Sequence, residues 1–422
     1  MIPAGVATQR PPDARLLVID KWGAITHRVR VDFPALVDEG DVVVANDAAT
    51  LPASLAGIHV PTASAVEVRL AGRDSLRTRD VTRFTVVVFG AGDFRTPTEH
   101  RPAPPALDPG DRLRLGPLRA IVQKVLGHPR LIEVRFEHTV ADIWEGLARH
   151  GRPIQYSYVP EPMAIWDTWT PIAGLPVAFE APSAGFILDW RVIGALCARG
   201  AAFATLTHAA GISSTGDARL DRLLPLDEPY DIPSSTAASI EACKGRGGRV
   251  IAIGTTVVRA LEHAAHADGT VRPGEGTATQ RIGPLTPLRC VDAIVSGTHE
   301  RGTSHYDVLR AFQDDAVLVR MEREADALGY RTHEFGDSVF LSDGRPTVAD
   351  AELASASEGW CGRGDSKRGV VARVSSCREM LFASANRGFI PRSMTCPVAS
   401  CRGVRDRFVS DHAAPVVTNR GD

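Results

Sequence analysis

The second half of the chain alternates short apolar segments with helical ones, and this alternation restricts the fold more than any other feature. Residues 249–253 (RVIAI) predict a buried strand, Gly254 a turn, and residues 257–267 a helix. A similar unit follows, with a strand over residues 290–295, a polar loop and a helix from Ser304. Strands that alternate with helices in this way indicate an α/β domain with a mixed, partly parallel sheet.

Between residues 57 and 153 the pattern differs, because short apolar stretches are separated by clusters of Gly, Pro and Asp. Short strands at such spacing indicate a small all-β module. Residues 16–20 (LLVID) and 41–45 (DVVVA), which precede it, predict buried strands. We therefore expect an α/β main domain and, inserted into it, a small β-barrel-like domain, with the boundaries 1–57 and 150–345 for the former and 58–149 for the latter.

Charge is unevenly distributed along the chain. The formal net charge is only −2, but residues 359–422 carry 11 Lys or Arg against 5 Asp or Glu. Residues 346–422 also lack a sustained apolar period, so we expect a weakly structured, basic tail there. Because the bulk composition is not basic, a nucleic-acid substrate has to be bound by a local patch.

Several classes of protein find no support in the sequence. No apolar run is long enough to span a membrane, and the N-terminus does not resemble a signal peptide, so we expect a cytoplasmic protein. Neither a P-loop nor a dinucleotide-binding glycine motif occurs at a strand-to-helix junction. His299 and His305 do not have the spacing of a zinc protease pair, and we expect no metal site.

The junction of strand, glycine turn and helix at Gly254 is the segment best suited to binding a ligand. A glycine turn brings free backbone N–H groups and a helix N-terminus to one point, where an anion binds well. Thr255, Thr256 and Arg259 add donors for a carboxylate or a phosphate. An ordinary capped junction without a ligand is the alternative interpretation.

Two further loops are weaker candidates. Residues 180–185 (EAPSAG) form an irregular segment of small residues that lets the backbone approach a ligand. Residues 205–217 place His208 in a loop after a predicted strand, and ligands of open α/β sheets usually bind at such strand ends. Either loop can equally be a structural connection.

Seven segments, taken in order along the chain, carry a resemblance to one known family. The segment GTTVVRALE at residues 254–262 is very near that family's GTTSVRTLE, and six others match in the same order. On these segments the chain resembles the S-adenosylmethionine:tRNA ribosyltransferase-isomerase family of queuosine biosynthesis. The other six are residues 12–18 (PDARLLV), 40–47 (GDVVVAND), 61–70 (PTASAVEVRL), 181–185 (APSAG), 292–299 (DAIVSGTH) and 335–337 (FGD).

The resemblance implies an α/β domain with an inserted β-barrel and a defined reaction. The ribosyl part of S-adenosylmethionine, a co-substrate, is transferred to a 7-aminomethyl-7-deazaguanine base in tRNA and isomerised to give epoxyqueuosine, while adenine and methionine leave. This chemistry needs no metal or resident cofactor, but it does need a general base and a holder for the methionine carboxylate. The motifs assign substrate binding to Pro182, Ser183, Ala184, Gly185, Gly254, Thr255, Thr256, Arg259 and Asp337.

Most of the family's motif histidines are changed in this chain. The family's LHVGAGTF corresponds to residues 206–213 (LTHAAGIS), so the histidine moves by one position to His208, which on a strand turns it to the other face. The histidine of MHSE corresponds to Leu226, although Glu228 remains, and His299 is retained. We therefore predict His208, His299 and Glu228 as the candidate catalytic residues.

The changed histidines leave two alternatives to this function. One is a paralogue that uses S-adenosylmethionine or a related nucleoside on another acceptor. The other is a binding protein that keeps the nucleoside pocket without catalysis. The sequence does not indicate an oligomeric state.

Overall fold

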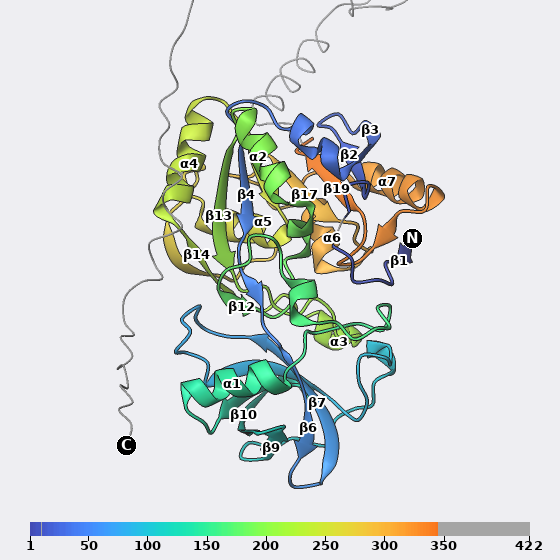
Figure 1. The fold of residues 1–422 in the computed structure, drawn as a ribbon, viewed down its shortest axis with the longest axis vertical. Coiled ribbons are helices and arrows are strands. Elements are labelled where there is room, and N and C mark those ends of the chain that lie inside the picture. Colours follow the sequence, from blue (N-terminus) through green and yellow to red (C-terminus); the bar gives the residue numbers. More distant parts are fainter. Residues whose placement is uncertain (10, 345–422) are drawn as a thin grey trace, which may run out of the picture. The chain divides into compact units, whose positions relative to one another are not determined.

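The structure is a computed structural model that describes residues 1–9 and 11–344. The basic tail expected at residues 346–422 lies outside the described residues. Figure 1 shows a large sheet with helices on both of its faces, and a group of strands, β6, β7, β9 and β10, that belongs to a separate barrel. This mixed sheet and barrel confirm the expected fold class.

The large sheet contains nine strands in the described residues. Their spatial order is β16 (Gly274–Ala278), β14 (Glu228–Ile232), β13 (Ala202–His208), β4 (Val42–Asn46), β15 (Val250–Ile253), β17 (Ala293–Gly297), β19 (Ser338–Ser342), β2 (Arg15–Ile19) and β3 (Ile25–Val29). The four strands from β13 to β17 are parallel, and antiparallel partners flank them on both sides. Strands β4, β15 and β17 are buried throughout, as parallel strands are when helices cover both faces.

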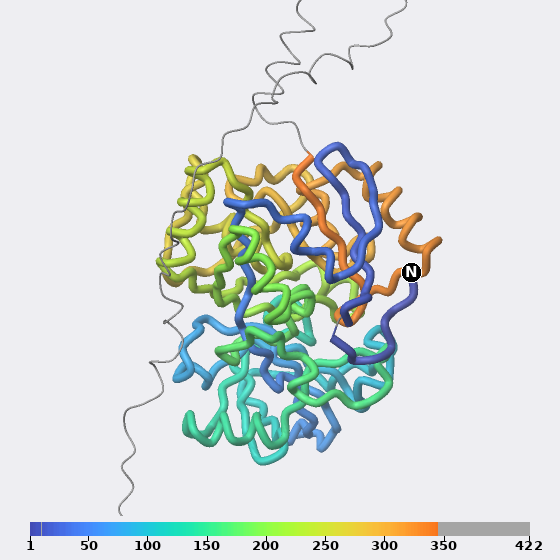
Figure 2. Tube along the Cα trace, turned by 45° about the horizontal axis from the view of Figure 1, so that its top comes forward, coloured from blue at the N-terminus to red at the C-terminus, as the bar shows by residue number. Residues whose placement is uncertain are grey.

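The two ends of the described chain meet inside this sheet. Strand β2, near the N-terminus, pairs in parallel with β19, the last described strand, and Figure 2 shows the two segments side by side in blue and orange. Two short two-stranded sheets lie apart from the large one, β1 (Ile2–Pro3) with β18 (Arg331–Thr332) and β5 (Ala49–Thr50) with β12 (Pro176–Ala178).

The barrel is closed and made of six antiparallel strands. Their order is β10 (Leu118–His128), β11 (Leu131–Phe136), β8 (Arg83–Phe89), β7 (Ser64–Gly72), β6 (Ser54–His59) and β9 (Arg112–Leu115). Its apolar core includes Leu113, Leu115 and Val134, together with Ile143 and Leu147 of helix α1 (Val140–His150). Strand β6 begins at Ser54, so the barrel includes residues before position 58.

Helices cover the large sheet on both faces. One face packs against α4 (Ser234–Gly245), α5 (Thr255–Ala264), α6 (Ser304–Leu309) and α7 (Asp315–Ala327). The other packs against α2 (Trp190–Ala198) and the 3-10 helices Arg30–Leu36 and Ser183–Ile187. The remaining helices are α3 (Ala218–Asp221) and the 3-10 helices Thr98–His100 and Ile165–Thr168. No helix in the described part of the chain is long and apolar enough to cross a membrane.

Candidate active site

The carboxyl ends of the parallel strands meet at one edge of the sheet, where Asn46 fixes them together. Its side-chain amide donates to the carbonyl of His208 at 2.9 Å, and its side-chain oxygen accepts the N–H of the same residue at 3.0 Å. The amide nitrogen also lies 3.5 Å from the Thr256 hydroxyl. One asparagine at the end of β4 thereby holds the end of β13 and the start of α5.

The turn between β15 and α5 depends on Gly254. Its φ of 98° and ψ of 156° place it in a region that essentially only glycine occupies. Its N–H donates to the carbonyl of Val295 at 2.8 Å, and an added Cβ would lie 3.2 Å from the Cβ of Ala184. The residue therefore allows the start of α5 to lie directly against the predicted loop at residues 180–185.

Replacing Gly254 by alanine should destabilise the fold by roughly 1–3 kcal/mol, because the new Cβ strains this backbone conformation. S-adenosylmethionine binding should weaken as the turn shifts. Urea unfolding and calorimetric titration measure the two effects. Gly245→Ala is the matched control, since no atom lies within 4 Å of the added Cβ. Equal stability of the two variants would show that the turn does not need glycine.

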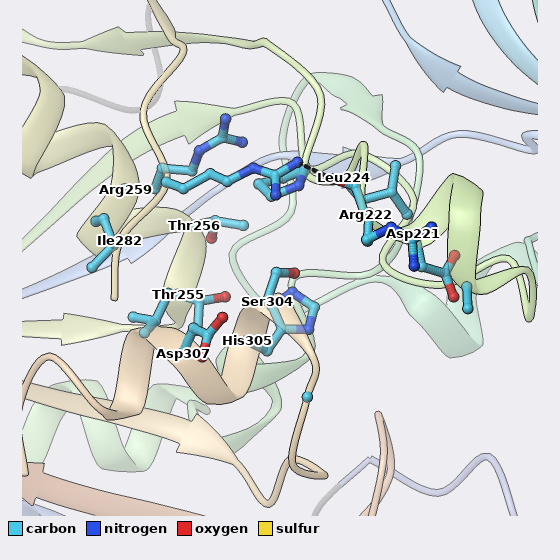
Figure 3. A pocket seen from close by; sticks show the side chains of 15 residues that line it. Asp221, Arg222, Leu224, Thr255, Thr256, Arg259, Ile282, Ser304, His305 and Asp307 are labelled. Carbon is cyan, nitrogen blue, oxygen red and sulfur yellow. Dashed lines mark hydrogen bonds between the residues drawn. The ribbon is translucent and has the colours of Figure 1, made fainter. Parts of the chain in front are cut away.

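Two adjoining cavities open at this edge of the sheet. The larger, of about 490 Å³, falls in the range of roughly 300–1,000 Å³ typical of small-molecule sites. Figure 3 shows Thr255, Thr256, His305 and Asp307 around it. The smaller is a narrow cavity of about 60 Å³ that shares Thr255, Thr256 and His305 with the larger one.

Most predicted binding residues line the smaller cavity together. They come from the segment after β12 and the turn after β15, namely Pro182, Ser183, Ala184, Gly254, Thr255 and Thr256, and the predicted catalytic residue His299 joins them from the loop after β17. Gly185 lies behind them, where an added Cβ would come within 2.8 Å of Thr170 Cγ2. Three segments distant in the sequence thus meet where the strand ends converge.

Arg259 also borders the larger cavity, but its guanidinium is largely engaged by the protein itself. Nε donates to the carbonyl of Gln280 at 3.0 Å, and Nη2 donates to those of Leu226 and Ala278, each at 2.8 Å. Nη1 donates to Glu228 in a buried ion pair. Arg259 therefore serves mainly to hold the protein together. From the sequence we had predicted instead that its guanidinium is free to bind a ligand carboxylate.

Two of the predicted catalytic residues, Glu228 and His208, lie behind the cavities. Glu228 Oε1 accepts the N–H of Gly211 at 2.6 Å, while Oε2 pairs with Arg259. Burial raises the pKa of Glu228, against the opposing effects of Arg259 and the Gly211 N–H. His208 is 0% exposed, and burial together with Arg259 lowers its pKa to about 3. At that pKa the ring is neutral near pH 7, and its Nε2 lies 3.4 Å from Glu228 Oε2.

Asp337 lies away from both cavity linings and connects elements of the sheet. One carboxylate oxygen accepts the N–H of Arg15 at 2.9 Å, and the other accepts the N–H of Arg331 at 2.8 Å. The Arg15 guanidinium approaches it at 3.3 Å. These contacts tie β2 to the turn before β19.

His299 and His305 form a ring pair at the smaller cavity. Their ring centroids are 4.8 Å apart, and His299 Nε2 lies 2.9 Å from the hydroxyl of Ser296. Burial lowers the pKa of His305 to about 4, so that this imidazole is neutral near pH 7. His299 is thus the one predicted catalytic residue that borders the cavity, and His305 joins it from the start of α6.

Glu180 is a cavity residue to which the sequence analysis gave no chemical role. Its carboxylate accepts a hydrogen bond from the Tyr156 hydroxyl and another from the N–H of Ser213 at 3.0 Å. Burial raises its pKa from 4.5 to about 7, although both of these groups oppose the rise, and Glu334 nearby adds to it. A carboxyl group that titrates near neutral pH in a cleft is suited to accept a proton from a substrate.

The described residues show no cluster of three or more His, Cys, Asp or Glu side chains that could hold a metal ion. The arrangement instead presents helix-terminal amides, hydroxyls, two imidazoles and one titratable carboxyl group around a cavity. These groups can hold an anion and move a proton.

Comparisons with known proteins agree with the resemblance. Residues 2–341 match the family described as queuosine biosynthesis protein. The S-adenosylmethionine:tRNA ribosyltransferase-isomerase of Thiobacillus denitrificans is 30% identical, over 81% of this chain and 95% of the relative. The enzyme of that name from Anaeromyxobacter dehalogenans is 31% identical, over 81% and 96%. A crystal structure of S-adenosylmethionine tRNA ribosyltransferase from Thermotoga maritima aligns with a TM-score of 0.41 and 20% identity, covering 81% of this chain and 95% of that one. With a family match over nearly all the described residues, the chain belongs to the queuosine biosynthesis protein family.

Proposed function

We propose that the chain transfers and isomerises the ribosyl part of S-adenosylmethionine onto a 7-aminomethyl-7-deazaguanine base in tRNA, giving epoxyqueuosine. The observation that carries the proposal is the cavity pair at the Gly254 turn, where the matching motif GTTVVRALE begins. Two relatives of about 30% identity that bear the name of this enzyme support it. Because the acceptor is a tRNA, the proposal also places the protein in the cytoplasm.

The start of α5 binds the methionine carboxylate in this proposal. Free amides of the first helical turn and the hydroxyls of Thr255 and Thr256 supply donors at the positive end of the helix dipole. Arg259 contributes its charge from behind, since its nitrogens are occupied by Glu228 and backbone carbonyls. The larger cavity then receives the nucleoside.

We assign the first proton transfer to Glu180. The sulfonium of S-adenosylmethionine acidifies the neighbouring ribosyl C5′ protons, and a carboxylate with a pKa of about 7 is deprotonated often enough at neutral pH to remove one. His299 and the neutral His305 border the same cavity, where their rings can contact the departing adenine. His208 and Glu228, which we predicted from the sequence as alternatives for the base, support the site from behind.

The test is to incubate the full chain with S-adenosylmethionine and a tRNA that carries the 7-aminomethyl-7-deazaguanine base. Release of adenine and methionine together with a mass increase of the tRNA is the expected result. Adenine release that does not change the tRNA would replace this proposal with the paralogue acting on another acceptor. Tight binding of S-adenosylmethionine without any adenine release would instead favour the non-catalytic binding protein.

A further inference from the structure

Five arginines lie on the outer surface of the barrel and form what we call the arginine face, namely Arg83, Arg112, Arg114, Arg119 and Arg135. Their strands alternate in burial, so that Leu113 and Leu115 point into the barrel core while the arginines between and beside them point outward. Four of the five are exposed, and Arg135 is half-buried. The face is thus built by the same alternation that builds the core.

The strand register brings these side chains together. Arg135 is directly opposite Arg83 on β8 and opposite Ile121 on β10, which in turn is opposite Arg112 on β9. This row crosses four strands and spans about 14 Å along the curved sheet. Two residues further along these strands, on the same face, Arg114 is directly opposite Arg119. Like charges directly opposite each other destabilise a sheet, so the arrangement is not explained by stability.

No ion pair neutralises the face in the described part of the chain, although two carboxylates lie on the same outward side of β11: Glu137 is opposite Arg119, and Glu133 is two residues from Arg135. None of the five guanidinium groups donates a hydrogen bond or forms an ion pair with a carboxylate among the described residues. Two other arginines of the barrel differ from these five. Arg69 and Arg101 are buried, and both form ion pairs with Glu67. These two buried arginines thus share a carboxylate partner, whereas the arginines of the arginine face form no ion pair.

We propose that the arginine face binds the phosphate backbone of the RNA substrate. Several cations on neighbouring strands, none of them in an ion pair, match a polyanion whose phosphates repeat along a strand. The chain as a whole has a net charge of −2, so its overall charge does not attract a nucleic acid. Binding to one therefore requires a local concentration of positive charge such as this face. That the RNA is a tRNA rests on the proposed function.

The barrel is joined to the catalytic cleft by the segment around α3. Leu220 and Leu224 belong to the same apolar cluster as the barrel core, and His128 Nε2 lies 3.3 Å from Asp217. A Cβ added to Gly216 would overlap the backbone of Glu99. Leu224 also lines the larger cavity, so RNA held on the barrel is attached to the same packed body as the cleft.

The experiment compares the full chain with the triple variant Arg112→Gln, Arg114→Gln, Arg119→Gln. Anisotropy of a fluorescent tRNA transcript gives the dissociation constant at several salt concentrations between about 50 and 200 mM. Each lost phosphate contact reduces the slope of log K against log salt by about 0.7–0.9, so the triple variant should lower it by about 2 and weaken binding at least roughly tenfold. The dissociation constant of S-adenosylmethionine should not change.

A triple variant of the same charge, Arg149→Gln, Arg301→Gln, Arg310→Gln, is the control, because each of these arginines has a carboxylate partner. It should bind the transcript within about twofold of the unmodified chain, as exposed ion-paired charges contribute little. If both variants lose the same affinity for the transcript, the loss is explained by net charge alone, and the proposal is overturned. Normal tRNA binding by the arginine-face variant, or no binding by the unmodified chain, would overturn it as well.

Two further results distinguish RNA binding by the arginine face from membrane binding and from the proposed function. If the arginine-face variant loses binding to phosphatidylglycerol vesicles but not to tRNA, the face serves an anionic membrane and the RNA proposal fails. If the unmodified chain binds tRNA through the face but never releases adenine, the proposed function fails while the RNA-binding face stands. If adenine release depends on tRNA but the variant binds tRNA normally, the proposed function stands and the RNA-binding role of the arginine face is rejected.

Discussion

Replacing Glu180 by glutamine should lower turnover by roughly 100- to 10,000-fold, the usual contribution of a general base. The amide has nearly the same shape but cannot accept the proton, so S-adenosylmethionine should still bind with a similar dissociation constant. The two effects are separated by single-turnover release of adenine and by calorimetric titration. Glu161→Gln is the matched control, because this glutamate is exposed and borders neither cavity.

The pH dependence provides a second measurement of the same residue. Burial raises the pKa of Glu180 to about 7, and only its deprotonated form can act as a base. The rate should therefore rise as pH increases through about 7, and this rise should disappear in Glu180→Gln. Tyr156→Phe removes a hydrogen bond that lowers the pKa, so it should move the rise to higher pH. An unchanged rise in both variants would assign the titration to another group.

Replacing Arg259 by alanine should destabilise the protein by about 3–5 kcal/mol, because it leaves the buried Glu228 without its cationic partner. The carbonyls of Leu226, Ala278 and Gln280 lose their donor as well. Chemical unfolding at pH 7 measures the change. Arg149→Ala, which removes an exposed arginine, should stay within about 0.5 kcal/mol of the unmodified protein.

A double variant separates the structural role of Arg259 from a role in binding. Arg259→Ala combined with Glu228→Gln should recover part of the stability, since an uncharged side chain is less costly to bury than a lone carboxylate. If Arg259→Ala instead unfolds like the unmodified protein and only weakens S-adenosylmethionine binding, the guanidinium contacts the ligand directly. The interpretation made from the sequence alone would then be the better one.

Short strands with β-branched residues and glycine turns made much of the α/β fold predictable. The strand expected over residues 41–45 is β4, shifted by one residue, and RVIAI includes β15. The helix expected over residues 257–267 after the Gly254 turn is α5, which begins two residues earlier and ends at Ala264. Local patterns succeed there because burial on both faces selects apolar residues at every position. The strand expected over residues 290–295 begins instead at Ala293, because Cys290 and Val291 donate their N–H groups to Glu262.

The chemical roles of the candidate residues were harder to predict, because they depend on contacts between distant segments. His208, expected in a loop after a strand, is instead the last residue of β13, and the pairing of β13 with β14 and the cluster around Glu228 bury its ring. Glu180 lies in a segment that was predicted to be a loop of small residues. The neighbouring residues in the sequence do not indicate that its pKa is near 7. Its environment comes from Tyr156, Ser213 and Glu334, which only the folded chain brings to it.

The pairing of β2 with β19 has a consequence for synthesis on the ribosome. The six barrel strands are near neighbours in the chain and can close while later residues are still being translated. The large sheet cannot, because β19 fills the place between β17 and β2 and is the last described strand to be made. All six barrel strands are therefore synthesised before the large sheet can be completed. A chain released before Ser338 carries two open strand edges and is a substrate for aggregation and proteolysis.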